Sequence, residues 1–250
     1  MKIAVIGAGN MGGALIKGWA KAAREDKADL DITLTARTQQ TLDKFAALYP
    51  ELHTLLNNKE AIQDADIVLL AVKPWLIDSV LCEMGDALQD KTVISVAANA
   101  RHERIDVYVM PNIAAEFGQS MTFVEETPNA EALQSAVSLF SLVGQQQVVD
   151  QKHMGAGMMM AGCGIAYVMR FLRAMMEGGV EMGFYPKDAK QIAMQTMQGA
   201  ITLLQETGLH PEVAIDKVTT PGGVTIKGLN ELDHASFNSA VIRCLKAGLK

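Results

Sequence analysis

The chain has 250 residues, enough for one large or two ordinary domains. Apolar residues make up 49% and charged residues 20%, which excludes wholesale disorder. The net charge of −6 argues against nucleic acid as a partner, because binding phosphates requires a basic face. Cys82, Cys163 and Cys244 lie far apart and lack zinc-ligand spacing, which favours reduced thiols in a cytoplasmic protein and no metal site. No secretory signal is expected, since no basic segment precedes an apolar one at the start.

A short β-branched run, residues 2–6, leads into a turn with the pattern G-x-G-x-x-G, and an apolar helical period follows. This context is typical of a dinucleotide-binding turn. We expect Gly7 to allow a tight turn, Gly9 to let the backbone approach a pyrophosphate, and Gly12 to let helix and strand pack closely. The pyrophosphate would lie at the helix N-terminus. The alternative is a glycine-rich turn that binds no ligand.

The second predicted strand, residues 32–36, ends where this fold selects its cofactor. An acid there binds the ribose 2′-hydroxyl of NAD, whereas an arginine accommodates the 2′-phosphate of NADP. No acid lies between Asp31 and Asp43, and Arg37 and Thr38 stand there instead. The sequence therefore favours NADP(H). The alternative is that Arg37 is an ordinary solvated surface residue.

Strands and helices continue to alternate as far as residue 149. Further strands are expected at 55–56, 67–72, 92–96, 108–110, 120–124 and 144–149, with helices from 57, at 76–88 and at 130–142. The alternation predicts an α/β fold with a doubly wound parallel (Rossmann) sheet. Ligands bind such sheets beyond the carboxyl ends of the strands, so residues 71–74, 97–99 and 111–112 join the glycine turn as candidate segments. Ala71, Ala97 and Ala98 are small enough for a nicotinamide ring to lie against the backbone, although each also fits ordinary packing.

From Met154 onward the sequence predicts helices only, at 154–182, 187–207, 211–218, 224–232 and 236–249. We therefore expect an NADP-binding Rossmann domain at 1–152 and an all-helical substrate-binding and dimerisation domain at 153–250. The segment 154–182 is apolar nearly all round until Arg170, which predicts a buried helix. Its uncharged run, 154–169, is short for a membrane span. A small helical domain cannot easily surround such a helix, so we expect a homodimer or a higher homo-oligomer, with a methionine-rich substrate pocket as the alternative.

A loop at 219–225, TTPGGVT, interrupts the helical series. It precedes a predicted helix, so it exposes backbone N–H donors, and its glycines let a ligand approach them closely. That arrangement is suited to binding a carboxylate. A helix–helix turn with a threonine cap fits the spacing equally well.

These stretches together resemble the pyrroline-5-carboxylate reductases, which reduce the C=N bond of 1-pyrroline-5-carboxylate to L-proline with NAD(P)H. The likeness covers almost the whole chain. It includes the stretches IGAGNMG at 6–12, AVKP at 71–74, SVAA at 95–98, MPN at 110–112 and the loop 218–225.

The resemblance implies cofactor contacts from several segments. Ala8, Asn10 and Met11 are expected along the pyrophosphate and ribose. Arg37, Thr38 and Asn58 are expected near the adenosine 2′ end, and Val72, Lys73, Ala97 and Ala98 near the nicotinamide. With Gly7, Gly9, Gly12, Ala71 and Asn112, these residues make up the predicted site for NADPH, with NADH as a second option.

The resemblance also implies a substrate site. The backbone of Gly223 and Val224, with Gly222 in the same loop, is expected to hold the substrate carboxylate. The Thr225 hydroxyl is expected to reach the ring nitrogen, which makes Thr225 the catalytic candidate. In the family a similar loop reaches the active site of the dimer mate.

The chain departs from the family pattern at residues 161–165, AGCGI, where the family has S-G-S-G-P. Without the proline we expect a more regular helix there. The segment between 99 and 108 is also short for the family. Related 6-phosphogluconate and β-hydroxyacid dehydrogenases carry a lysine base on the long helix, but no lysine lies between His153 and Tyr185. A hydroxyacid dehydrogenase of that type and a non-catalytic NADP-binding redox sensor remain as alternatives.

Overall fold

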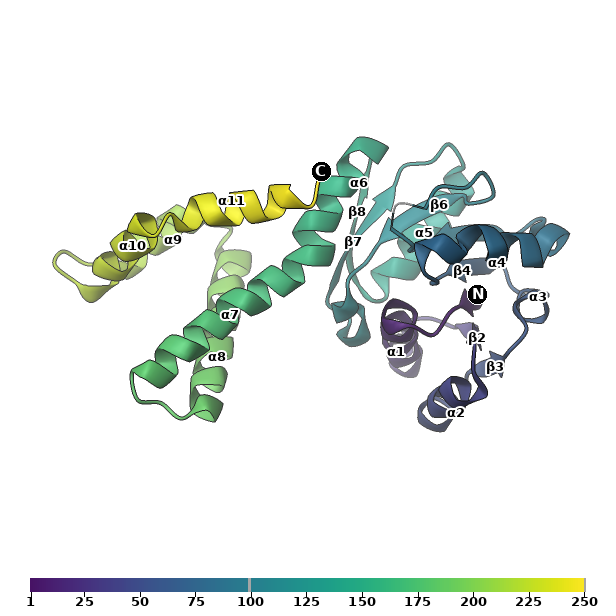
Figure 1. The fold of residues 1–250 in the computed structure, drawn as a ribbon, viewed down its shortest axis with the longest axis horizontal. Helices are drawn as coiled ribbons and strands as arrows, with labels where there is room; N and C mark the ends of the chain where they lie inside the picture. The colour runs from purple at the N-terminus through teal and green to yellow at the C-terminus, as the bar shows by residue number, and fades with distance from the viewer. Residues whose placement is uncertain (99, 250) are drawn as a thin grey trace. The chain divides into compact units, whose positions relative to one another are not determined.

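The computed structural model describes residues 1–98 and 100–249 (Figure 1). Asn99, part of the candidate segment 97–99, and Lys250 lie outside the described residues. The chain forms two compact units, Met1–Cys163 and Gly164–Lys250. Residues 153–163, which we expected in the helical domain, pack with the first unit.

The first unit is built on one eight-stranded sheet of order β3-β2-β1-β4-β5-β6-β7-β8. The strands are β1 (Lys2–Ile6), β2 (Asp31–Thr35), β3 (His53–Leu55), β4 (Ile67–Leu70), β5 (Thr92–Ser95), β6 (Val107–Met110), β7 (Ser120–Glu125) and β8 (Gly144–Val149). Strands β1 to β6 are parallel, and the order changes direction between β1 and β4. This is the doubly wound arrangement, so the predicted fold class is confirmed.

The sheet is not parallel throughout, because β7 runs antiparallel to β6. Residues 111–119 join the two strands and contain only the 3-10 turn η3 (Ile113–Phe117). A parallel neighbour would need a crossover of about a dozen residues or more, so this short connection forces the reversal. Strand β8 then pairs parallel to β7 after the helix α5 (Ala130–Ser141).

Helices cover both faces of this sheet (Figure 1). Helices α1 (Asn10–Arg24), α2 (Gln39–Leu48) and α5 close one core, whereas α4 (Ile77–Met84) closes the other; α3 (Asn58–Ala61) is a single short turn. Successive side chains of a strand point to opposite faces, and β1 accordingly sends Ile3 and Val5 into the first core and Ala4 and Ile6 into the second.

Trp19 anchors the first core. Its side chain is fully buried, its indole N–H donates to the carbonyl of Leu139 at 3.0 Å, and its ring packs against that of Phe140 in a T-shaped arrangement. Helix α4 is shorter than the predicted helix 76–88, because the 3-10 turns η1 (Pro74–Leu76) and η2 (Gly85–Leu88) flank it and Gly85 has a φ of 54°.

After β8 the chain is helical. The helices are α6 (Gln151–Gly157), η4 (Met158–Cys163), α7 (Gly164–Glu181), α8 (Pro186–Thr207), α9 (Pro211–Val218), α10 (Val224–His234) and α11 (Phe237–Ala247). Element η4 is a turn of π-helix, so the expectation of a more regular helix across residues 161–165 is wrong. The Asn112 amide donates to the carbonyl of Ala161 at 3.4 Å, which gives a partner to a carbonyl in this wider turn.

The Gly164–Lys250 unit buries few side chains. Its buried residues are small, and Gly179 lies against Ala189 where α7 and α8 pack side by side (Figure 1). The large apolar side chains stay exposed, for example Val168 at 52%, Met182 at 77% and Ile242 at 54%. The long helix is buried at its start, where Met154 and Met159 are 4% and 5% exposed. Further along, α8 and Phe237 of α11 cover only part of α7. Burial of the rest by a partner's helices stays a prediction.

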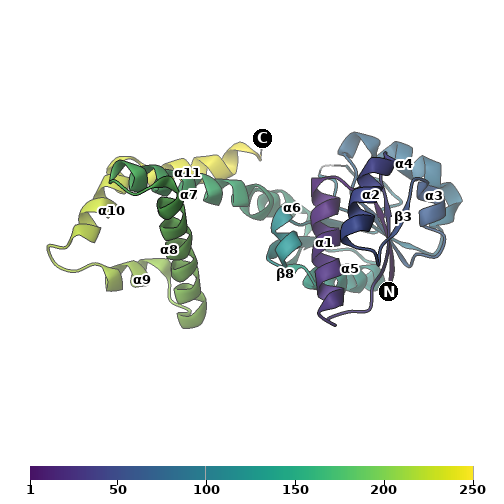
Figure 2. The same ribbon diagram turned by 90° about the horizontal axis from the view of Figure 1, so that it is seen from below.

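By length and composition, the continuous helical stretch Gln151–Glu181 is apolar enough to cross a membrane, a test that core helices of soluble proteins also pass. Figure 2 shows helices α8 to α11 of the second unit, in which the loop at 219–223 joins α9 to α10.

Candidate active site

The turn between β1 and α1 requires two of its glycines. Gly7 has a φ of +110°, and its N–H donates to the carbonyl of Thr35 at 3.2 Å. A Cβ added to Gly7 would lie 2.8 Å from the carbonyl oxygen of Ala71. A Cβ added to Gly12 would lie 2.1 Å from the carbonyl oxygen of Gly7. A side chain at either position would therefore clash with the backbone, so the turn requires glycine at both.

Gly9 is different, because no atom lies within 4 Å of the place that its Cβ would occupy. It is the N-cap of α1, and no side chain caps the helix there. The first-turn N–H groups of α1 therefore lack a side-chain partner, and the helix dipole favours an anion beside them. The space and the donors fit a dinucleotide pyrophosphate, with Ala8, Asn10 and Met11 along the same turn.

The carboxyl ends of neighbouring strands meet beside this turn. The N–H of Ala71 donates to the carbonyl of Ile6 at 2.9 Å, and the N–H of Val96 donates to that of Leu70 at 3.1 Å. The segments 71–73 and 96–98 therefore lie at the same edge as the glycine turn. Asn112 follows β6 at this edge, which brings the predicted nicotinamide-side residues together with the pyrophosphate turn.

Asn112 is 6% exposed, and both polar atoms of its side-chain amide form hydrogen bonds within the protein. Its Oδ1 accepts from the N–H of Ala114 at 3.0 Å, while its Nδ2 donates to Ala161. These bonds fix the π turn of η4 beside the end of β6. The geometry therefore points to Asn112 as a residue that positions this edge of the site.

Arg37 and Thr38 follow β2 and are exposed. In the part of the chain that the structure describes, no acidic side chain pairs with Arg37, so its charge is available to a ligand phosphate. Asn58 lies nearby in the fold, because its Oδ1 accepts from the Thr35 hydroxyl at 2.7 Å. Its Nδ2 donates to the Glu83 carboxylate at 3.1 Å. Sequence reasoning missed Glu83, which comes from α4 and carries no local signal.

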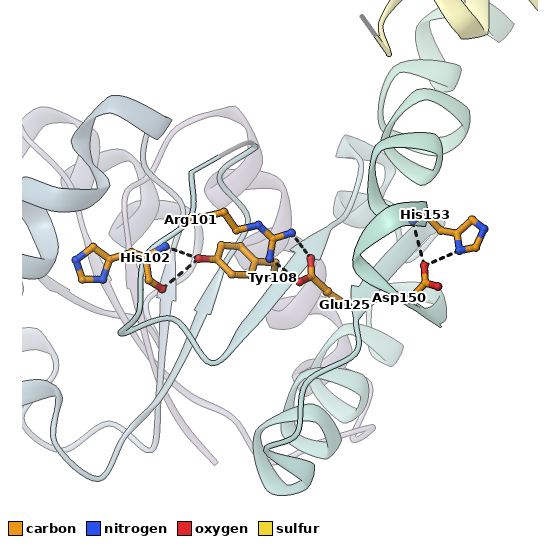
Figure 3. Close-up of polar contacts among 6 residues, drawn as sticks. All are labelled: Arg101, His102, Tyr108, Glu125, Asp150 and His153. Carbon is orange, nitrogen blue, oxygen red and sulfur yellow. Dashed lines mark hydrogen bonds and ion pairs between the residues drawn. The ribbon is translucent and has the colours of Figure 1, made fainter.

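A second cluster fixes the short loop after β5 (Figure 3). The Arg101 guanidinium donates to both oxygens of the largely buried Glu125, each at 2.5 Å, and lies 4.2 Å from the centre of the Tyr108 ring. The hydrogen bonds to Glu125 raise the pKa of Arg101 above its ordinary value. The Tyr108 hydroxyl accepts from the N–H of His102 at 2.6 Å and donates to its carbonyl at 3.2 Å. These contacts hold Arg101 and His102 beside Tyr108 and Glu125.

Figure 3 also shows His153 beside Asp150, with Nδ1 and Oδ1 2.6 Å apart. Asp150 caps α6 by accepting from the N–H of His153 at 3.2 Å. Desolvation raises the pKa of Asp150, but the hydrogen bonds from Lys152 and His153 outweigh it and leave the pKa lowered. Both side chains are substantially exposed, so this pair is a helix cap on the surface.

The loop between α9 and α10 presents backbone donors of its own. Gly222 has a φ of +72°, and Gly223 is the N-cap of α10 with no side-chain cap. The Val224 side chain is 81% exposed. Across the described residues, the Thr225 hydroxyl makes no hydrogen bond. The loop can therefore offer an anion the N-terminus of α10, with a hydroxyl one residue further on.

Among the residues that the structure describes, no three His, Cys, Asp or Glu side chains converge as metal ligands. The sheet edge presents the uncapped N-terminus of α1, and the start of α10 presents uncapped backbone donors and the Thr225 hydroxyl.

Two family models match the chain. Residues 2–99 match the NADP oxidoreductase, coenzyme F420-dependent family, and residues 151–250 match pyrroline-5-carboxylate reductase dimerisation. The pyrroline-5-carboxylate reductase of Methanosarcina acetivorans is 34% identical over 97% of this chain and 94% of its own length. Pyrroline-5-carboxylate reductase 1 of Dictyostelium discoideum is 35% identical over 96% of this chain, which spans 47% of that longer protein.

The solved structure of a pyrroline-5-carboxylate reductase from Coxiella burnetii superposes with a TM-score of 0.86 at 27% identity, over 98% of this chain and 95% of that one. The similarity in sequence and in structure thus extends across both units. The chain belongs to the pyrroline-5-carboxylate reductase family.

Proposed function

We propose that the chain reduces the C=N bond of 1-pyrroline-5-carboxylate with NADPH to give L-proline, the last step of proline biosynthesis. The observation that carries this proposal is the start of α10, where uncapped backbone donors stand beside the Thr225 hydroxyl, which makes no hydrogen bond to any residue that the structure describes. A small carboxylate with a ring nitrogen next to it matches that pair of groups. The reductases to which the chain aligns act on such a substrate.

This reaction needs few acid–base groups from the protein. A protonated imine is already an electrophile, so hydride transfer depends mainly on positioning. NADPH, when bound, supplies the hydride from its nicotinamide ring. The substrate carbon accepts that hydride, the π electrons of the C=N bond move to nitrogen, and the nitrogen keeps its proton.

The chain's own residues then have defined roles. The N–H groups of Gly223 and Val224 hold the substrate carboxylate, and the Thr225 hydroxyl lies at the ring nitrogen. Ala97 and Ala98 offer a flat surface to the nicotinamide, and Arg37 favours its 2′-phosphate form. The absence of a lysine between His153 and Tyr185 disfavours a hydroxyacid dehydrogenase, which needs a base there.

We further propose a cytoplasmic homodimer in which the α10 loop serves the partner's cofactor site. Three observations support it. The helical unit matches a family model of dimerisation, its large apolar side chains are exposed in a single chain, and the three cysteines are free thiols. Exposed apolar surface of this extent is typical of a subunit interface.

The test is to follow NADPH absorbance after adding 1-pyrroline-5-carboxylate and to identify proline in the product. We expect turnover of about 1–1,000 per second, as for most metabolic enzymes. No oxidation of NADPH or NADH would contradict the proposal. Oxidation of a hydroxyacid would support the dehydrogenase instead, and tight NADPH binding without any turnover would support the redox sensor.

A further inference from the structure

We propose that Glu83 opposes Arg37 at the adenosine 2′ end of the cofactor site and lowers the preference for NADPH over NADH. The inference rests on the proposed use of NAD(P)H, and it concerns only the nucleotide-binding part of the site. Glu83 lies on α4, far along the chain from the strand end that selects the cofactor in this fold. A chain of hydrogen bonds connects the two places.

The first link is Thr35, the last residue of β2. Its carbonyl accepts from the N–H of Gly7 at 3.2 Å, so Thr35 lies directly beside the pyrophosphate turn. Its side chain is 2% exposed, and its hydroxyl donates to Oδ1 of Asn58 at 2.7 Å.

The second link is the Asn58 amide. Because Oδ1 is bonded to the Thr35 hydroxyl, the amide is oriented with its NH₂ group on the other side. That NH₂ group donates to Oε2 of Glu83 at 3.1 Å. The carboxylate of Glu83 is therefore held two hydrogen bonds from the end of β2.

The charge of Glu83 is not neutralised by a neighbour. Glu83 is exposed, and within the described residues no lysine, arginine or histidine forms an ion pair with it. A carboxylate at this end of the site can accept a hydrogen bond from a ribose 2′-hydroxyl and repels a 2′-phosphate. The segment between Asp31 and Asp43 has no acid, and the fold supplies one from α4.

Two charges of opposite sign thus act on the same nucleotide group. Arg37 attracts the 2′-phosphate of NADP, and Glu83 disfavours it. Their balance, rather than Arg37 alone, sets how strongly the chain discriminates between the two cofactors.

The experiment is calorimetric binding of NADP⁺ and NAD⁺, which differ only in the 2′-phosphate, to the full chain and to Glu83→Gln. Glutamine keeps the shape and the acceptor for Asn58 but removes the charge. We expect the ratio Kd(NAD⁺)/Kd(NADP⁺) to rise roughly three- to tenfold, as removal of one nearby like charge in a solvated site predicts. Arg37→Asp should change the ratio in the opposite direction.

The matched control is Asp86→Asn, which removes the same charge from an exposed residue just beyond α4. It should leave the ratio within twofold of the wild type. An equal change of both affinities in Glu83→Gln, or the same ratio change in Asp86→Asn, would overturn the inference. If the wild-type protein binds neither nucleotide, both this inference and the proposed function are overturned. If it binds both nucleotides but does not reduce 1-pyrroline-5-carboxylate, only the proposed function fails, and the ratio of the two Kd values still tests the role of Glu83.

Discussion

The two units of the chain differ in how they bury apolar side chains. In Met1–Cys163, large residues such as Leu15 and Trp19 are fully buried, and two cores cover both faces of the sheet. In Gly164–Lys250, the buried residues are small, and Met182 is 77% exposed. The sheet unit therefore buries its large apolar side chains within one chain, whereas the described residues of the helical unit leave many of theirs exposed.

This difference has a functional consequence. The predicted nucleotide-binding residues lie on the unit that buries its large apolar side chains by itself, and the proposed substrate loop lies on the unit that does not. We therefore expect cofactor affinity to depend on the sheet unit alone and turnover to depend on assembly.

We expect the largest loss of activity from Ile242→Glu. Ile242 lies on α11, and its side chain is 54% exposed in a single chain. On a solvated surface the change would alter stability by at most about 0.5 kcal/mol. In a subunit interface it buries an unpaired carboxylate, which dissociates the dimer and lowers activity by roughly 100-fold. Analytical ultracentrifugation and NADPH oxidation measure both effects.

The control for this variant is Gln195→Glu, which places the same charge at an exposed polar position on α8. It should leave assembly and activity unchanged. Dimeric, fully active Ile242→Glu would contradict the contrast between the two units.

A smaller effect is expected from Gly9→Ala in the sheet unit. A methyl group there meets no protein atom within 4 Å, but it enters the space assigned to the pyrophosphate. We expect NADPH affinity to fall roughly 10- to 100-fold with little change in Tm, in line with the cost of overpacking a filled site. Gly12→Ala is the matched contrast, because its methyl group would lie 2.1 Å from the Gly7 carbonyl oxygen and should lower Tm as well. Equal Tm losses in the two variants would count against an open site at Gly9.

Thr225→Ala tests whether the two units have separate roles, because turnover reports on the α10 loop and NADPH affinity reports on the sheet unit. Loss of one hydrogen bond to a charged ring nitrogen should lower kcat/KM roughly 10-fold. NADPH affinity should not change, because the sheet unit is untouched. Thr225→Ser, which keeps the hydroxyl, should retain most of the activity, and an unchanged kcat/KM in Thr225→Ala would remove the residue from its proposed role.

The smallest effect is expected from Glu125→Gln, which leaves the Arg101 guanidinium with a neutral partner. We expect a loss of about 1–2 kcal/mol in the free energy of unfolding, seen as a Tm lower by several degrees. Glu103→Gln lies in the same part of the chain, and Glu103 is exposed and forms no ion pair with residues 1–98 or 100–249, so it should leave Tm unchanged. If both variants behave alike, the Arg101–Glu125 pair does not stabilise this loop.

Local pattern predicted much of the fold. The bounds of β8 and α9 agree with the predicted segments 144–149 and 211–218, because turn residues and periodicity mark their ends. The reversal at β7 was not predicted. It follows from the short connection after β6, and strand direction depends on which strands meet, which periodicity does not encode.

The candidate site was predictable where its residues are contiguous, as in the glycine turn and the loop at 219–225. It was not predictable where distant segments meet. Glu83 reaches Asn58 from another helix, Arg101 reaches Glu125 from the loop between β5 and β6, and the π turn depends on Asn112. Each of these is a long-range pair whose members are unremarkable in their own stretch of sequence.

The central claim is that one active site combines the sheet unit of one chain with the α10 loop of another. Mixing Gly9→Ala and Thr225→Ala subunits tests it most directly, at NADPH concentrations below the Kd of Gly9→Ala. Half of the dimers are mixed after random exchange, and each mixed dimer holds one site with both halves intact. We therefore expect roughly 30% of wild-type activity, whereas each variant alone keeps roughly a tenth or less. Activity that stays at the level of the separate variants, in a mixture shown to contain mixed dimers, would contradict the shared site.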